Sequence, residues 1–222
     1  MGAVFGRDRE LAHADTLLES AAGRSGSLLL EGEPGIGKTT VWREVVSRAE
    51  DRGFRVLAAQ PAEAETKLAL SAVADLLEGV PEPAFAALPD PQRRALEVAL
   101  LRVAPGAAAP EPRTLATGLR SLLAELTAEA PLLVAIDDVQ WVDLSSARML
   151  AFALRRLPDE RVRWLFAQRL GVPTRLAVDE LVPPESLERL TIGPLTLAAL
   201  HHLLEERLHR PLSRSVLVRV HG

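Results

Sequence analysis

A glycine-rich stretch at residues 32–39, GEPGIGKT, constrains the fold of this chain more than any other feature. The apolar run SLLL precedes it, and a helical apolar pattern, TTVWREVVSRAED, follows it. Glycine weakens strands and helices alike, so three glycines at this junction predict a turn with unusual backbone angles. The spacing matches G-x-x-x-x-G-K-[ST], a loop whose main-chain N–H groups surround a phosphate. The sequence therefore predicts a phosphate-binding loop between a strand and a helix.

The residue types of this loop suit the parts of a nucleotide. A side chain at either of the last two glycines would block the approach of the backbone to the anion. Lysine supplies a cation for the β and γ phosphates, the following threonine hydroxyl can ligate Mg²⁺, and the helix dipole adds to the attraction. The alternative, a glycine-rich turn that only connects two elements, is disfavoured by the flanking strand and helix. The residues expected to bind nucleotide are Glu33, Pro34, Gly35, Ile36, Gly37, Lys38, Thr39 and Thr40, with Thr39 as a metal ligand.

A pair of acids, Asp137 and Asp138, follows the apolar run 132–136. A carboxylate at the end of a buried strand near the loop can hold the Mg²⁺ that bridges the nucleotide phosphates, and Asp137 is assigned this role. Asp138 is expected to polarise the attacking water. Because aspartate is shorter than the glutamate often found at such a position, slow hydrolysis is expected. Two acids that simply close a strand at a surface turn are the alternative.

The segment VRWLFAQR at 162–169 is predicted to be a strand beside the loop strand, with its end near the γ-phosphate. Arg169, or Gln168 beside it, would then sense that phosphate. A solvated strand end is an equally open alternative. Arg155 and Arg156 could act as an arginine finger toward a neighbouring subunit, although a solvated helix end that complements the dipole is favoured.

Apolar periodicity predicts strands that alternate with helices along the chain. Strands are expected at 28–30, 54–60, 132–136, 162–169 and 187–192. Helices are expected at about 8–22, from the glycine loop to Gly53, at 68–80, over 115–126, after the N-caps Asp90, Asp143 and Thr196, and from Ser213. Together with the glycine loop, this order predicts an α/β fold, a three-layer αβα P-loop NTPase with a mainly parallel five-stranded sheet. Trp42 and Trp164 are expected in the core, Trp141 against the core or beside the site, and His201 and His202 on the surface.

Proline divides the chain into regions. Seven of the 16 prolines lie in residues 81–112, which predicts an insertion, with 106–112 as a mobile loop. We expect a P-loop nucleotide-binding domain over 1–193 and the beginning of a helical lid domain at 194–222, cut short where the chain ends.

The composition excludes several classes of protein and site. Lys and Arg number 26 against 30 Asp and Glu, a net charge of -4, so the chain as a whole has no electrostatic reason to bind nucleic acid. The absence of cysteine excludes disulfides and thiolate metal sites. Charged residues 7–10 stand where a secretory signal would be apolar, and no apolar run approaches the roughly 20 residues that cross a bilayer. A cytoplasmic location and no membrane contact are expected.

Four segments, taken in order, resemble the nucleotide-binding domain of the STAND class of P-loop ATPases, which are AAA+ relatives. The resemblance implies that the five-stranded sheet is of the ASCE/AAA+ type. More narrowly, they are similar to the N-terminal ATPase of large ATP-binding regulators of the LuxR type. The segments are VFGRDREL at 4–11, GEPGIGKTT at 32–40, LLVAIDDVQWVD at 132–143, and WLFAQR at 164–169 followed by IGPL at 192–195.

The resemblance implies a nucleotide switch, in which ADP keeps the protein closed and ATP exchange opens it and often leads to self-association. It implies that Asp137 serves Mg²⁺, that Arg169 senses the γ-phosphate, and that DNA is bound only by a C-terminal helix-turn-helix absent from this chain. It also places four residues against the adenine: Val4, Phe5, Gly6 and Arg7.

Two other functions are compatible with a P-loop. One is a kinase that phosphorylates a small molecule, whose pocket or lid the 81–112 insertion could supply. The other is an assembly scaffold that keeps ADP permanently and hydrolyses nothing.

Overall fold

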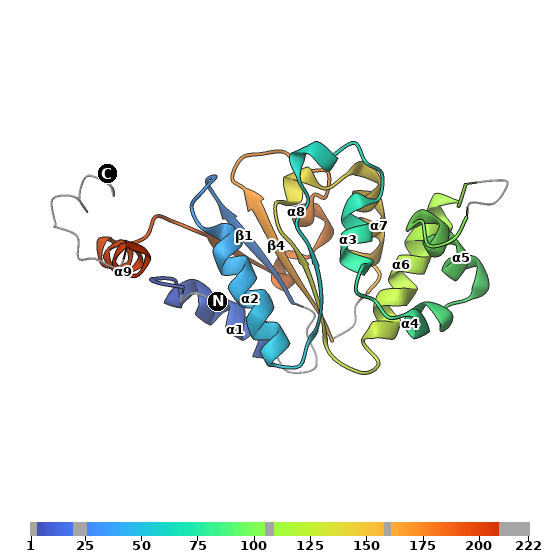
Figure 1. The fold of residues 1–222 in the computed structure, drawn as a ribbon, viewed down its shortest axis with the longest axis horizontal. Helices are drawn as coiled ribbons and strands as arrows, with labels where there is room; N and C mark the ends of the chain where they lie inside the picture. The colour runs from blue at the N-terminus through green and yellow to red at the C-terminus, as the bar shows by residue number, and fades with distance from the viewer. Residues whose placement is uncertain (1–3, 20–25, 105–108, 158–160, 209–222) are drawn as a thin grey trace.

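The structure, a computed structural model, describes residues 4–19, 26–104, 109–157 and 161–208. A central sheet lies between two layers of helices (Figure 1). Its strands are β1 (Gly26–Gly32), β2 (Arg55–Ala59), β3 (Leu132–Ile136), β4 (Val162–Arg169) and β5 (Leu187–Thr191). The α-helices are α1 (Asp8–Glu19), α2 (Lys38–Asp51), α3 (Ser71–Leu77), α4 (Glu82–Ala86), α5 (Asp90–Ala99), α6 (Pro112–Leu126), α7 (Leu144–Leu154), α8 (Val178–Leu181) and α9 (Leu197–Leu208). Short 3-10 turns occupy Glu63–Glu65, Val139–Trp141 and Pro184–Ser186.

The strands lie in the order β2-β3-β4-β1-β5, and every neighbouring pair is parallel. The predicted five-stranded parallel sheet is therefore confirmed, as is the position of 162–169 beside the strand that leads into the glycine loop. Parallel strands end at a common edge of a sheet, where open α/β folds bind ligands. Gly32, Ile136 and Arg169, which end β1, β3 and β4, accordingly lie at this edge.

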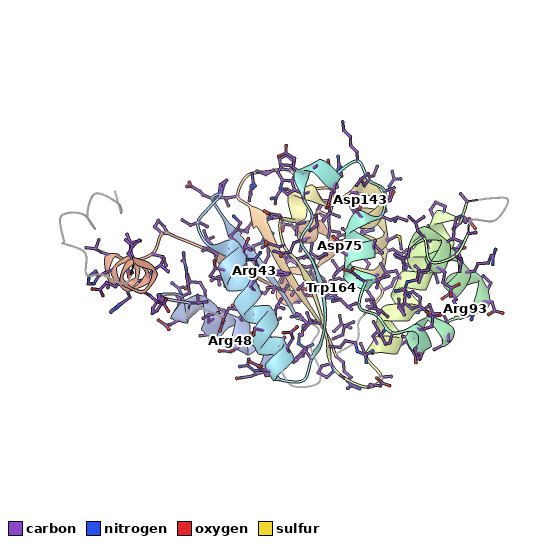
Figure 2. All side chains as sticks on the ribbon, viewed as in Figure 1. Arg43, Arg48, Asp75, Arg93, Asp143 and Trp164 are labelled. Atoms are coloured by element: carbon purple, nitrogen blue, oxygen red, sulfur yellow. The ribbon has the colours of Figure 1, made fainter. Side chains whose placement is uncertain are left out.

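The two faces of the sheet carry separate apolar clusters. Helices α1 and α2 cover one face, and α3, α6 and α7 cover the other, as Figure 1 shows to the left and right of the strands. Trp42 of α2 is 3% exposed and Trp164 of β4 is 2% exposed, which confirms both as core residues. Figure 2 places Trp164 among the strands. The burial of large apolar side chains on both faces fixes β1 and α2 in place, and thereby fixes the glycine loop that joins them.

Two of the three testable helix caps are confirmed. The carboxylate of Asp143 accepts hydrogen bonds from the N–H groups of Ser145 and Ser146 at the start of α7. The hydroxyl of Thr196 accepts one from the N–H of Ala199 at 3.2 Å. The third, Asp90, is wrong as an N-cap, because Pro89 precedes the first turn of α5 and no side chain caps it.

Other helix boundaries differ from those that the apolar periodicity predicts. The helix expected at 68–80 begins only at Ser71, because Leu70 takes a left-handed conformation with φ 68°. The first helix is confirmed as far as Glu19, and its predicted last turn lies outside the described residues. The helix predicted from Ser213 lies outside them too.

The proline-rich stretch 81–112 is folded over its described part. Helices α4 and α5 bury Phe85 and Leu96 against α6. Gly118 of α6 allows the close approach, because a Cβ there would lie 3.1 Å from Leu96 Cγ. Of the loop expected at 106–112, residues 109–111 lead into Pro112 at the start of α6, and 106–108 lie outside the described residues.

Candidate nucleotide site

The glycine loop turns through two left-handed residues, Gly35 with φ 77° and Gly37 with φ 104°. The N–H of Ile36 donates to the carbonyl of Glu33 at 3.3 Å and closes the turn. A Cβ at Gly35 would meet no protein atom within 4 Å. The backbone angle therefore requires glycine at this position, because glycine reaches positive φ at little steric cost.

The N-terminus of α2 opens directly onto this turn. Gly37 occupies the N-cap position and no side chain caps the helix. The first N–H groups of an α-helix have no acceptor within the helix, and they carry the positive end of its dipole. The loop thus presents main-chain donors that suit an anion.

Lys38 is a buried cation, only 6% exposed. Its Nζ donates to the carbonyl oxygens of Gly32 at 3.1 Å and Glu33 at 2.9 Å. Burial lowers the pKa of Lys38, while the nearby carboxylates of Asp138 and Asp137 act in the opposite direction. Over the described part of the chain no salt bridge is formed by Lys38, so its charge lacks a partner that a bound phosphate would supply.

Asp137 follows β3 and is 2% exposed. Its Oδ1 accepts the N–H of Asp138 at 2.9 Å, and its Oδ2 accepts a hydrogen bond from Nε2 of Gln60 at 3.2 Å. Gln60 was not among the residues predicted for the site. The sequence shows that Gln60 follows the strand β2, but only the sheet order places the end of β2 beside Asp137.

Asp138 adopts a left-handed conformation, φ 44°, which directs the chain into the Val139–Trp141 turn. Nε2 of Gln140 donates to its Oδ1 at 2.6 Å, and Nε of Arg169 lies 3.9 Å from the same oxygen. Oε1 of Gln140 accepts the main-chain N–H of Arg169 at 3.2 Å. Gln140, which the sequence did not single out, therefore ties the end of β4 to the acidic pair.

The structure separates the two proposed sensors. Gln168 donates from Nε2 to Oε1 of Glu31 at 2.8 Å, a pair between neighbouring strands. Arg169 instead lies toward Asp138, with its guanidinium carbon 5.3 Å from the ring centroid of Trp141. The acidic pair, Lys38 and Arg169 thus share one region, and Trp141 flanks it.

Arg155 and Arg156 directly follow α7 and are exposed. The guanidinium of Arg156 lies 4.0 Å from the ring of Phe152, in the last turn of α7. His201 of α9 is paired with Glu205 at 3.2 Å.

Arg7, predicted to lie against adenine, is 5% exposed and has three protein partners. Its Nη1 donates to Oε1 of Glu10 at 2.9 Å and to the carbonyl of Gly193 at 2.8 Å. Its Nη2 donates to the carbonyl of Ile36 at 2.8 Å. Arg7 therefore links the N-terminal segment and the chain after β5 to the glycine loop.

The rest of the N-terminal segment lies against the end of the described chain. Gly6 has φ 64°, and a Cβ there would lie 2.2 Å from the Cβ of Ala199, so α9 approaches closely. The rings of Phe5 and His202 stack with centroids 6.4 Å apart. Val4 packs against the cluster under α1 and α2.

The donor set fits a hard cation such as Mg²⁺ held in part by phosphates. Within the described ranges, no group of three or more His, Cys, Asp or Glu could hold a metal without a ligand's help. The Asp137 carboxylate and the half-buried Thr39 hydroxyl are oxygen ligands, which Mg²⁺ prefers together with substrate phosphates and water.

Residues 3–166 match the family described as the AAA ATPase domain. This chain belongs to that family. No curated protein matches it. In the part of the chain that the structure describes, no helix is both long and apolar enough to cross a membrane.

Solved AAA-type structures share the fold. AMPPCP-bound DnaA from Aquifex aeolicus is 17% identical with a TM-score of 0.53, and the match covers 97% of this chain and 56% of the DnaA chain. Orc1 from Aeropyrum pernix in complex with DNA is 20% identical with a TM-score of 0.54, covering 99% and 56%. Cdc6p from Pyrobaculum aerophilum is 13% identical with a TM-score of 0.59, covering 96% and 52%. The chain thus spans a little over half the length of these proteins, and at such identities the likeness concerns the fold alone.

Proposed function

We propose that this AAA ATPase domain is a nucleotide switch, which binds ATP or ADP with Mg²⁺ and hydrolyses ATP slowly to ADP and phosphate. The observation that carries the proposal is the buried Lys38, a cation without an ion-pair partner among the described residues, beside Asp137, Asp138 and Arg169. A polyphosphate is the anion that such a set suits, because its charge is spread over several oxygens that one lysine and a helix N-terminus can share.

Each residue has a proposed role in binding. The main-chain donors of residues 35–39 hold the β-phosphate, and Lys38 reaches the β and γ oxygens. Thr39 and Asp137 hold Mg²⁺, and Gln60 fixes the orientation of the Asp137 carboxylate through its 3.2 Å hydrogen bond. Mg²⁺, when bound, neutralises charge on the phosphates. Val4, Phe5, Gly6 and Arg7 are proposed to border the adenine.

Slow hydrolysis is supported by the surroundings of Asp138. Its Oδ1 already accepts the amide of Gln140 at 2.6 Å and lies 3.9 Å from Nε of Arg169. A water that is to be oriented by this oxygen must compete with Gln140. Arg169 is proposed to sense the γ-phosphate, because its guanidinium is near Asp138 while Gln168 is held by Glu31.

A single-turnover experiment with protein in excess over ATP tests the hydrolytic role. We expect wild type to release phosphate slowly and Asp138→Asn to release it about 100-fold more slowly, because a general base contributes roughly that much or more. Affinity for ATP should change less than about threefold, since Asp138 is not proposed to hold the phosphates. Asp51→Asn, an exposed acid at the end of α2, is the matched control.

The same experiment distinguishes the rival functions. Absence of phosphate release from wild type over hours would contradict the hydrolytic role and favour the ADP-bound scaffold, which the engaged Oδ1 of Asp138 also suits. Consumption of ATP only with an added acceptor would favour a kinase. The described part of the insertion gives a kinase no support, because α4 and α5 pack on α6, across the sheet from α2 (Figure 1).

The regulatory role is proposed from the resemblance of four segments to LuxR-type STAND regulators. On this proposal residues 1–193 form the nucleotide-binding domain, with 81–112 as its insertion, and 194–222 begin a helical lid. Exchange of ADP for ATP would lead to self-association. Contact with DNA would be made by an effector outside this chain, which fits its net charge of -4.

A further inference from the structure

The strand β2 forms an edge of the sheet and pairs only with β3. The N–H of Arg55 donates to the carbonyl of Pro131 at 2.8 Å, and the carbonyl of Ala59 accepts the N–H of Asp137 at 3.0 Å. In a parallel pair, alternate residues direct both main-chain groups to the partner strand. Residues 55, 57 and 59 therefore face β3, and the N–H and C=O groups of Val56 and Ala58 point away from it.

This outer edge is open. No hydrogen bond found among the described residues engages the main-chain groups of Val56 or Ala58. Ala58 is exposed and Val56 is partly exposed. An edge strand with free N–H and C=O groups is a template for a further strand unless it is covered.

A groove of about 420 Å³ runs along this edge. One wall is β2 from Arg55 to Ala58, and the other is the second half of α3 with the turn that follows it, including Val80 and Pro81. Both walls belong to rigid elements, since α3 packs on β2. The lining includes the apolar residues Val56, Ala58 and Val80 beside the free main-chain groups.

The α3 wall is acidic. Asp75 of α3 and Glu78, the C-cap residue of α3 with helical backbone angles, both line the groove and lie three residues apart. Figure 2 labels Asp75 beside α3. Partial burial, together with Glu65 and Glu78, raises the pKa of Asp75, as expected where like charges gather. Glu78 and Asp75 thus present negative charge to whatever occupies the groove.

The arginines that line this groove and the neighbouring hollow, Arg55 and Arg102, already have partners. Arg55, at one end of the groove, is paired with Glu129 at 3.0 Å. Arg102, which lines a neighbouring hollow with Asp75 and Glu78, donates to the carbonyl of Leu77 at 3.3 Å and lies 3.7 Å from Glu82. Among the described residues neither Asp75 nor Glu78 has a salt-bridge partner, so both carboxylates can pair with a cation of a bound ligand.

We propose that this groove binds an extended peptide, with basic residues at alternate positions, as an additional strand beside β2. Its main chain pairs with Val56 and Ala58, and every second side chain lies over α3. Residues two apart on a strand are about 6.6 Å apart, close to the roughly 5–6 Å between helix positions three apart, so two basic side chains can meet Asp75 and Glu78. Such strand addition combines main-chain affinity with side-chain specificity.

Fluorescence anisotropy with a labelled acetyl-Val-Arg-Val-Arg-Val-Arg-amide probe tests the proposal. We expect saturable binding of this peptide, and none of the peptide with glutamate in place of arginine. The same arginine peptide, N-methylated at every backbone amide, keeps its charge but has no main-chain donors for pairing with a strand, and should not bind. In the Asp75→Asn/Glu78→Gln variant the affinity should fall about tenfold, the effect of two exposed ion pairs.

The control variant Asp90→Asn/Glu111→Gln removes two exposed acids of the α5–α6 region and should bind the probe as wild type does. Lys38→Ala should also bind normally, so a failure of the nucleotide proposal is distinguishable from a failure of this one. Equal binding of the N-methylated peptide, equal binding by the Asp75/Glu78 variant, or no saturation up to about 1 mM would overturn the proposal.

Discussion

Replacing Lys38 by alanine is expected to weaken the binding of ATP and ADP by about 100-fold or more, because removing one member of a buried charge pair costs roughly 2–5 kcal/mol. Nζ of Lys38 is held in place by the carbonyls of Gly32 and Glu33 before any ligand binds, so little side-chain freedom is lost on binding. The residue is 6% exposed, which keeps water from screening its charge.

Calorimetric titration of each protein with ATP and with ADP measures this loss. The control is Lys67→Ala, which removes the sequence's other lysine from an exposed position and should leave both affinities unchanged. The Lys38→Ala protein should remain folded, because only two hydrogen bonds to carbonyls are lost and a buried charge is removed. Unchanged affinity in a folded Lys38→Ala protein would refute the proposed role of the loop.

Replacing Asp143 by alanine is expected to lower the free energy of unfolding by about 4 kcal/mol, since several buried donors would be left without an acceptor. The side chain, labelled in Figure 2, is 1% exposed and joins the start of α3 to the start of α7. Its carboxylate accepts hydrogen bonds at 2.9–3.4 Å from the N–H groups of Leu70, Ala72, Ser145 and Ser146 and from the hydroxyl of Ser71.

The effect of Asp143 should depend on pH. Burial acts to raise its pKa, but the hydrogen bonds from Ser146, Leu70 and Ala72 outweigh it, and the net pKa lies below the ordinary value of 3.8. A carboxyl group with a depressed pKa in the folded state contributes stability above its unfolded pKa and loses it as pH falls through the folded pKa. The difference between wild type and Asp143→Ala should therefore be constant at neutral pH and shrink below about pH 4.

Urea unfolding followed by tryptophan fluorescence measures both effects. Asp90→Ala is the matched control, because Asp90 also begins a helix but is 88% exposed and only pairs with Arg93 at 2.9 Å. It should change stability by less than about 0.5 kcal/mol. A loss of unfolding free energy below about 1 kcal/mol for Asp143→Ala would contradict the proposed role of Asp143 at the starts of α3 and α7. A stability difference between wild type and variant that grows as pH falls would contradict it too.

The sheet could be predicted from the sequence because its strands are apolar runs bounded by glycine, proline or acids. The strands expected at 132–136 and 162–169 are confirmed with their bounds, and the others within two residues at each end. The same local signals placed the glycine loop and Asp143, since a turn or a cap depends on residues a few positions apart. Arg169 and the acidic pair followed from the rule that parallel strands end at one edge.

The features that could not be predicted from the sequence depend on contacts between segments far apart in the chain. Leu70 is left-handed where its N–H reaches the Asp143 carboxylate, a bond across 73 residues that periodicity cannot detect. Gln60 and Gln140 could be assigned to the site only from the sheet order, which places β2 beside β3 and β3 beside β4. Asp90 failed as a cap because Pro89 already has the extended conformation that precedes a helix, and its carboxylate binds Arg93 instead.

A crystal structure of the protein with Mg²⁺ and a non-hydrolysable ATP analogue is the most direct test of the nucleotide site. We expect the β-phosphate inside the turn from Glu33 to Lys38, within hydrogen-bonding distance of the N–H groups of Gly35 and Gly37 and of Nζ of Lys38. The metal should lie between Thr39 and Asp137. An analogue bound elsewhere on the protein, with the turn empty or filled by the protein's own side chains, would contradict the account.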